Sequence, residues 1–156
     1  MAVANECPAP SAAVARSDIA GLARAWIGTP YHHQASRQRV GVDCVGLVRG
    51  IFRSIYVREA ENVPGYSSDW GEVAGRETLL DAASRHLVAS DRSEPSVGDV
   101  VVFRMRRGAI AKHVGVMTST DTMVHAMERV GVVEVNLGMW WRRRIAGIFS
   151  FPGIED

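Results

Sequence analysis

The hydrophobic pattern of this chain changes its period once, near Pro95, and that change constrains the fold more than any other feature. Before Pro95, apolar residues recur at helical spacing in three segments; after it, β-branched residues gather in five short runs separated by turn residues. Helices followed by an antiparallel sheet are typical of an α+β domain. We therefore expect N-terminal helices packed on a central antiparallel sheet of about five strands.

The predicted helices are defined by their boundary residues. Ser17 is a good N-cap for the first, which Gly28 and Pro30 should end. The second covers residues 44–56, with a wide apolar stripe. The third covers 77–87, after a long surface connection. The predicted strands cover residues 97–103, 113–118, 122–127, 130–135 and 145–151.

The domain organisation follows from length and composition. The 156 residues suit one domain and are too few for two of ordinary size. Residues 1–16 are rich in alanine and proline without a clear apolar face, which predicts a flexible N-terminal arm. Residues 17–156 are expected to form a single domain.

Charge and hydropathy exclude several function classes. Eighteen basic and seventeen acidic residues give a formal charge of +1, which does not favour nucleic-acid binding. No stretch approaches the roughly 20 apolar residues of a membrane span, and the N-terminus does not resemble a signal peptide. Cys7 and Cys44 lie in such different contexts that a disulfide between them is not expected. We expect synthesis in the cytoplasm without a signal peptide and no membrane insertion.

Cys44 is the candidate nucleophile because of its position at the start of a predicted helix. Asp43 is a plausible N-cap, and the free backbone N–H groups of a first helical turn favour a thiolate and can bind an oxyanion. A cysteine on an apolar helix face can also be a small apolar core residue, and that alternative stays open.

His113 and His125 are the candidate base and orienting residue. A hairpin centred on Ser119 would place the two histidines directly opposite each other on one face of the sheet. His113 could then accept the proton of Cys44 while His125 holds the imidazole in the productive tautomer, giving a thiolate–imidazolium pair. Structural histidines, or a zinc site formed by the same three residues, are the alternatives.

Several motifs resemble the NlpC-type cell-wall peptidases, which are papain-like cysteine enzymes. The similar segments span nearly the whole of residues 17–152, in the same order and spacing as in that family. They are Trp26-Ile27-Gly28-Thr29-Pro30-Tyr31, Gly41-Val42-Asp43-Cys44-Val45-Gly46-Leu47-Val48, Gly98-Asp99-Val100-Val101-Val102-Phe103, His113-Val114-Gly115-Val116 and Val124-His125-Ala126.

The resemblance implies hydrolysis of an amide bond in peptidoglycan stem peptides through an acyl-enzyme on Cys44, with no cofactor and no metal. Tyr31 matches the tyrosine of the family's Pro-Tyr motif, so its hydroxyl is expected at the site, although a core tyrosine is the alternative. Asp43 and Gln34 are expected to line the substrate and oxyanion region. Gln34 stands in a segment that departs from the family pattern, so the scissile bond of other members does not carry over.

A narrower resemblance is to the peptidases encoded among phage tail genes and in gene transfer agents. The similar segments include Tyr66-Ser67-Ser68-Asp69-Trp70 and Trp140-Trp141-Arg142-Arg143-Arg144. This resemblance implies a location in the tail of a virion or virus-like particle and action in the periplasm of the recipient cell. The cluster Trp140, Trp141, Arg142, Arg143 and Arg144 is predicted to bind tail or baseplate hub proteins, because Trp and Arg are enriched in interface hot spots. Tryptophans packed at the sheet edge with solvated arginines, or binding of anionic wall polymers, are the alternatives. A structural tail protein with a vestigial site is the alternative function.

Overall fold

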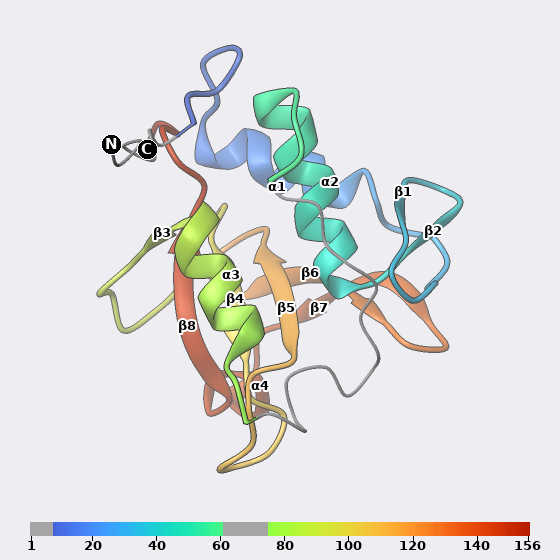
Figure 1. The fold of residues 1–156 in the computed structure, drawn as a ribbon, viewed down its shortest axis with the longest axis vertical. Coiled ribbons are helices and arrows are strands. Elements are labelled where there is room, and N and C mark those ends of the chain that lie inside the picture. The colour runs from blue at the N-terminus through green and yellow to red at the C-terminus, as the bar shows by residue number, and fades with distance from the viewer. Residues whose placement is uncertain (1–7, 61–74) are drawn as a thin grey trace.

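The computed structural model describes residues 8–60 and 75–156, and its centre is a six-stranded sheet with only antiparallel pairings (Figure 1). The strand order is β3-β8-β4-β5-β6-β7. These strands are β3 (Val88–Ala89), β4 (Val100–Phe103), β5 (His113–Met117), β6 (Thr122–Met127), β7 (Gly131–Asn136) and β8 (Ile145–Ser150). A separate hairpin pairs β1 (Ser36–Arg37) with β2 (Gly41–Val42).

Helices cover one face of the sheet, and a smaller cluster covers the other. The helices are α1 (Arg16–Arg24), α2 (Cys44–Tyr56), α3 (Thr78–His86) and α4 (Met139–Arg142). Because side chains alternate along a strand, Val114 and Val116 of β5 pack in the main core with α1, α2 and α3. Met117 instead joins a second cluster with Phe103 and Met123, against which Trp141 of α4 packs.

The predicted α+β class and the order of its elements are confirmed. The five predicted strands correspond to β4 through β8, and the three predicted helices correspond to α1, α2 and α3. The sheet gains a sixth strand, β3, because two residues after α3 pair with the end of β8. The two-residue strands β1, β2 and β3 and the single-turn helix α4 carry too little periodicity to be predicted.

Helix α1 begins two residues earlier than the sequence predicts. The cap is at Ala15 rather than Ser17, and the carboxylate of Asp18 accepts the N–H of Ala15 at 2.8 Å. The backbone of Arg16 is also fixed from outside the helix, because its N–H donates to the carbonyl of Glu155 at 3.1 Å. A contact from the other end of the chain therefore sets this helix start.

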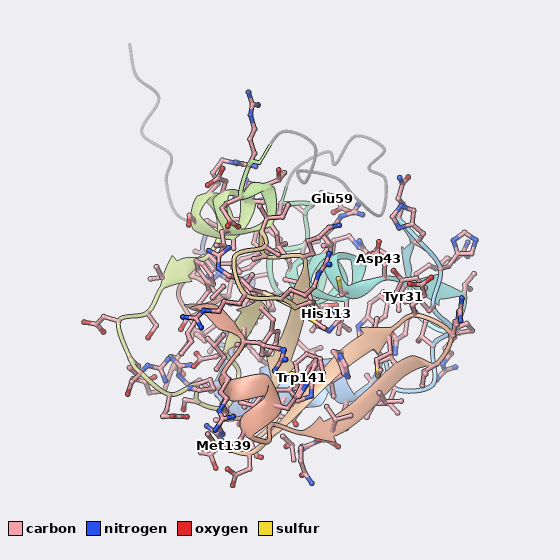
Figure 2. The ribbon with its side chains drawn as sticks, turned by 90° about the horizontal axis from the view of Figure 1, so that it is seen from below. Tyr31, Asp43, Glu59, His113, Met139 and Trp141 are labelled. Atoms are coloured by element: carbon pink, nitrogen blue, oxygen red, sulfur yellow. The ribbon has the colours of Figure 1, made fainter. Side chains whose placement is uncertain are left out.

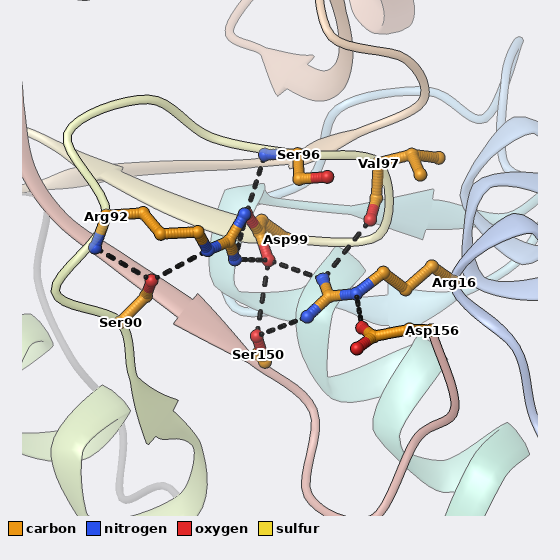
Figure 3. Close-up of polar contacts among 8 residues, drawn as sticks. All are labelled: Arg16, Ser90, Arg92, Ser96, Val97, Asp99, Ser150 and Asp156. Atoms are coloured by element: carbon orange, nitrogen blue, oxygen red, sulfur yellow. Dashed lines mark hydrogen bonds and ion pairs between the residues drawn. The ribbon is translucent and has the colours of Figure 1, made fainter.

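Asp99, in the Gly-Asp motif before β4, holds together segments that are far apart in the sequence (Figure 3). Its carboxylate is fully buried and forms ion pairs of 2.8 Å with both Arg16 and Arg92. It also accepts the N–H of Ser96 at 2.7 Å and the hydroxyl of Ser150 at 3.2 Å. The motif aspartate therefore ties α1, β8 and the loop before β4 together, away from the candidate active site.

The predicted flexible arm is only partly within the described residues. Residues 1–7, including Cys7, lie outside them, as do residues 61–74, which include Tyr66-Ser67-Ser68-Asp69-Trp70 and most of the predicted connection. The described part of the arm, residues 8–16, is held to the domain. Both the N–H and the hydroxyl of Ser11 donate to the carbonyl of Ile55 at 3.1 Å, because the segment crosses the C-terminal end of α2.

Candidate active site

Cys44 is the first residue of α2, and Asp43 is its N-cap, as predicted. The Asp43 side chain is almost fully buried and accepts the N–H of Gly46 at 2.7 Å. Its second oxygen accepts the N–H of Gln34 at 2.8 Å. Both carboxylate oxygens are therefore engaged with backbone, so Asp43 orients the start of α2 and the loop before it.

The first turn of α2 is pressed against the β1–β2 hairpin, and Gly46 makes this approach possible. A Cβ atom on Gly46 would lie 2.0 Å from the carbonyl oxygen of Ala35. The hydroxyl of Ser36 donates to the carbonyl of Gly46 at 2.5 Å. Since Cys44 is two residues away in the same turn, this packing also fixes the position of the thiol.

The thiol lies against the backbone at the start of β5. Its Sγ is 3.9 Å from the carbonyl oxygen of Lys112, and the N–H of Val114 is close enough to stabilise a thiolate. These two backbone groups flank His113 in the chain. Helix α2 and strand β5 therefore bring the predicted nucleophile and the predicted base to one place.

Burial decides the charge of the thiol in the ligand-free site. It raises the pKa of Cys44 to about 12, and the negative charge of Asp43 adds to this effect. The N–H groups of Val114, Val45 and Cys44 itself act in the opposite direction and lower the pKa. The resting side chain is therefore a neutral thiol, with N–H groups nearby that favour negative charge.

His113 and His125 form a direct hydrogen bond of 2.8 Å, between Nε2 of His113 and Nδ1 of His125. The predicted register is wrong, however. Val116 pairs with Val124 and Met117 with Met123, so the hairpin is centred on Thr120 and the histidines are diagonal neighbours. Because the observed register differs from the predicted one by two residues, both histidines still lie on the same face of the sheet. Their imidazole rings are long enough to meet across the diagonal.

His125 is fully buried and His113 is partly exposed, and the loss of solvent favours the neutral form of both imidazoles. Burial lowers the pKa of His113 to about 3, with His125 as a second cause, and it lowers the pKa of His125 to about 4. With Nε2 of His113 as the donor to Nδ1 of His125, Nδ1 of His113 is unprotonated and can accept a proton. The ligand-free site thus favours a thiol and an imidazole over the predicted thiolate–imidazolium pair.

Tyr31 lies in the same region, as Figure 2 shows for Tyr31, Asp43 and His113. It forms a bridge with Val42, immediately before the cap of α2. Burial raises the pKa of Tyr31 to about 12, and the negative forms of Cys44 and Asp43 add to it. Its hydroxyl therefore stays protonated and can donate. Gln34 is exposed and has a left-handed backbone with φ of 65°, and its N–H donates to the carboxylate of Asp43 at 2.8 Å.

The five residues predicted to bind a partner differ in where their side chains lie. Trp141 is half-buried and its ring contacts both His113 and His125. Trp140 is 50% exposed and carries the guanidinium of Arg144 over its ring at 3.8 Å. Arg142 is held by ion pairs, and Arg143 is exposed. Trp141 thus follows the alternative of packing against the sheet. Its contact with the two histidines was not predicted, because those residues come from strands far away in the chain.

Residues 8–60 and 75–156 include no cluster of three or more His, Cys, Asp or Glu side chains arranged to hold a metal ion. In the candidate site, Nε2 of His113 and Nδ1 of His125 bond to each other. Within the same residues, no helix is both long and apolar enough to span a membrane.

Comparison with known proteins finds endopeptidases of Escherichia coli among the proteins of similar sequence. The chain is 28% identical over 145 residues to the probable endopeptidase NlpC of Escherichia coli K12, covering 89% of this chain and 83% of that protein. It is 26% identical over 120 residues to the murein DD-endopeptidase MepS/murein LD-carboxypeptidase of the same organism, covering 76% of this chain but only 54% of that protein.

Solved structures share the fold. An NlpC/P60 family protein from Bacillus cereus superimposes with a TM-score of 0.65 at 22% identity, covering 94% of this chain and 42% of that one. The NlpC/p60 domain of the peptidoglycan hydrolase SagA gives 0.62 at 19% identity, covering 88% and 100%. The model of the NlpC/P60 family matches residues 28–148, which include Tyr31, Cys44, His113 and His125. The chain therefore belongs to the NlpC/P60 family.

Proposed function

We propose that this protein is a cysteine peptidase that cleaves amide bonds in peptidoglycan stem peptides. The observation that carries the proposal is the arrangement of Cys44 at the capped start of α2, against the backbone on both sides of His113, which is bonded to His125. The names of the relatives from Escherichia coli, a probable endopeptidase and a murein endopeptidase, support the substrate class.

The proposed reaction uses an acyl-enzyme. Cys44 Sγ attacks the carbonyl carbon of the amide while Nδ1 of His113 takes the thiol proton. The resulting oxyanion accepts hydrogen bonds from N–H groups in the first turn of α2, and the protonated Tyr31 hydroxyl is a further donor. His113 returns the proton to the leaving amine, the C–N bond breaks, and water then hydrolyses the thioester.

Because the thiol of Cys44 and the imidazole of His113 are both neutral before substrate binds, the bound substrate has to help stabilise the charges that form during the reaction. Proton transfer separates charge in a buried site, so the imidazolium and the oxyanion must be stabilised as they form. The hydrogen bond from Nε2 of His113 to His125 holds the ring while it gains the proton. The proposal also includes a peptidase domain formed by residues 17–156. In it, the Tyr31 hydroxyl donates a hydrogen bond in the site and Gln34 lines the region that binds the substrate.

Digestion of purified peptidoglycan tests the proposal. We expect the protein to release fragments whose masses correspond to cleavage of one stem-peptide amide bond. A Cys44→Ala variant should release none, and a Cys7→Ala variant should match the unaltered protein. Release of the same fragments by the Cys44→Ala variant would refute the assignment of the nucleophile.

We further propose that the enzyme is carried in the tail of a phage or gene transfer agent to open the wall during DNA delivery. The support is the resemblance of the segments 66–70 and 140–144, together with the exposed ring of Trp140 as a possible contact for a tail or baseplate hub protein. A Trp140→Ala variant should be depleted from purified particles while the free enzyme stays active. Particles without the unaltered protein would refute this role, and particles containing an inactive protein would favour a structural tail component.

A further inference from the structure

Trp141 packs against both imidazoles of the candidate site. Its indole is stacked with the ring of His113, with centroids 5.6 Å apart and planes inclined by 28°. The same indole lies nearly perpendicular to the ring of His125, at 5.1 Å and 83°. Figure 2 shows Trp141 beside His113, at the end of the site opposite Asp43. One side chain from α4 thus contacts the whole hydrogen-bonded pair.

Trp141 is itself held on its other sides. Phe103 meets it edge to face at 5.0 Å, and Trp140 does so at 4.8 Å. The helix that carries it is fixed by Arg142, which forms ion pairs with Glu94 and Asp121. The indole therefore has little freedom to move away from the histidines.

The hydrogen bonds of the pair do not fix His125 by themselves. Its Nδ1 bonds to His113, but its Nε2 is buried and has no hydrogen-bond partner among residues 8–60 and 75–156. Rotation of the His125 ring is therefore limited on that side by packing. The indole of Trp141, nearly perpendicular to this imidazole at a centroid distance of 5.1 Å, is part of the packing around His125.

We propose that Trp141 is a positioning residue that fixes the orientation of both imidazoles and so keeps Nδ1 of His113 free to accept the thiol proton. A flat ring stacked on His113 resists rotation of that imidazole and keeps water from its face. The π face of an indole within about 6 Å also attracts a cation, so Trp141 stabilises the imidazolium once His113 is protonated. The catalytic consequence rests on the proposed peptidase function, whereas the effect on the histidine pair does not.

The test compares ring-preserving and ring-removing substitutions. Trp141→Phe keeps a flat aromatic ring, Trp141→Leu keeps only apolar volume, and Met139→Leu is the control at an exposed position of the same helix. Trp141→Met replaces the leucine variant if that variant does not fold. Each protein is examined by nitrogen NMR of the histidine side chains, by the rate of Cys44 alkylation with iodoacetamide and by kcat and KM on peptidoglycan fragments.

We expect one histidine tautomer in the unaltered protein, in Trp141→Phe and in Met139→Leu, and exchange between tautomers in Trp141→Leu. We also expect Trp141→Leu to alkylate more slowly and to lose kcat by about tenfold with KM within about twofold. A single tautomer and unchanged kcat in Trp141→Leu would overturn the proposal. Equal losses in the Phe and Leu variants, in parallel with thermal stability, would make Trp141 a packing residue only. Failure of the unaltered protein to cleave peptidoglycan would refute the peptidase, while the NMR comparison would still decide the role of Trp141.

Discussion

Replacing Asp43 by asparagine should lower stability and raise the reactivity of the thiol at the same time. The carboxylate accepts two backbone N–H groups, from Gly46 at 2.7 Å and Gln34 at 2.8 Å. An amide has one oxygen, so one of these bonds is lost in a buried site. A hydrogen bond to a charged group contributes roughly 1.5–3 kcal/mol, so we expect a loss of roughly 2 kcal/mol in the free energy of unfolding.

Although it lowers stability, removal of the negative charge of Asp43 should make the Cys44 thiol more reactive. The negative charge of Asp43 is one of the causes that raise the pKa of Cys44. Its removal should increase the thiolate fraction at neutral pH, and iodoacetamide should alkylate Asp43→Asn faster, by roughly tenfold for each unit by which the pKa falls.

Urea unfolding and alkylation rates measure the two effects separately. Asp18→Asn is the matched control, because Asp18 accepts the Ala15 N–H at the exposed start of α1 and lies outside the candidate site. That variant should lose less stability and alkylate at the original rate. Unchanged stability or slower alkylation in Asp43→Asn would refute the account of the α2 cap.

Three further predictions follow from the buried polar groups. Burial lowers the pKa of His125 from 6.5 to about 4, so protonation of this residue favours the unfolded chain. The free energy of unfolding should therefore fall as the pH drops below about 6.5, by roughly 2 kcal/mol at pH 5 for this residue. A His125→Gln variant that loses as much stability on acidification would contradict this. His113→Ala should abolish hydrolysis and His125→Ala should reduce it less, as measured by kcat, and equal losses would argue against separate base and orienting roles. Asp99→Asn should cost roughly 2 kcal/mol in urea unfolding, because it removes the charge from the hydrogen bonds that Arg16 and Arg92 donate to a buried carboxylate; unchanged stability would refute that account.

The parts of the site that follow from local sequence were predicted. Asp43 and Cys44 are adjacent, and the helix they begin is marked by a wide apolar stripe, so the cap and the placement of the thiol at a helix start depend only on neighbouring residues. The same is true of the face shared by His113 and His125, since any even shift of register preserves it. These features do not depend on how the chain folds back on itself.

The features that were not predicted depend on long-range contacts. The hairpin register is set by its turn, where Thr118, Ser119 and Thr122 hydrogen bond to one another and move the centre to Thr120. Trp141 reaches the histidines only because α4 precedes β8, which crosses to pair with β4. The charge state of the site depends on how deeply the assembled domain buries it. No local pattern in the sequence contains this information.

Trapping of the acyl-enzyme tests the central claim, that Cys44 forms a thioester with its substrate, most directly. Hydroxylamine added during cleavage of a soluble peptidoglycan fragment competes with water for a thioester, so mass spectrometry should find a hydroxamate at the new carboxyl end of the product. We predict that the unaltered protein and Cys7→Ala form this hydroxamate and that Cys44→Ala forms neither hydroxamate nor hydrolysis product. Cleavage that yields only the carboxylic acid at every hydroxylamine concentration, or that persists in Cys44→Ala, would contradict the account.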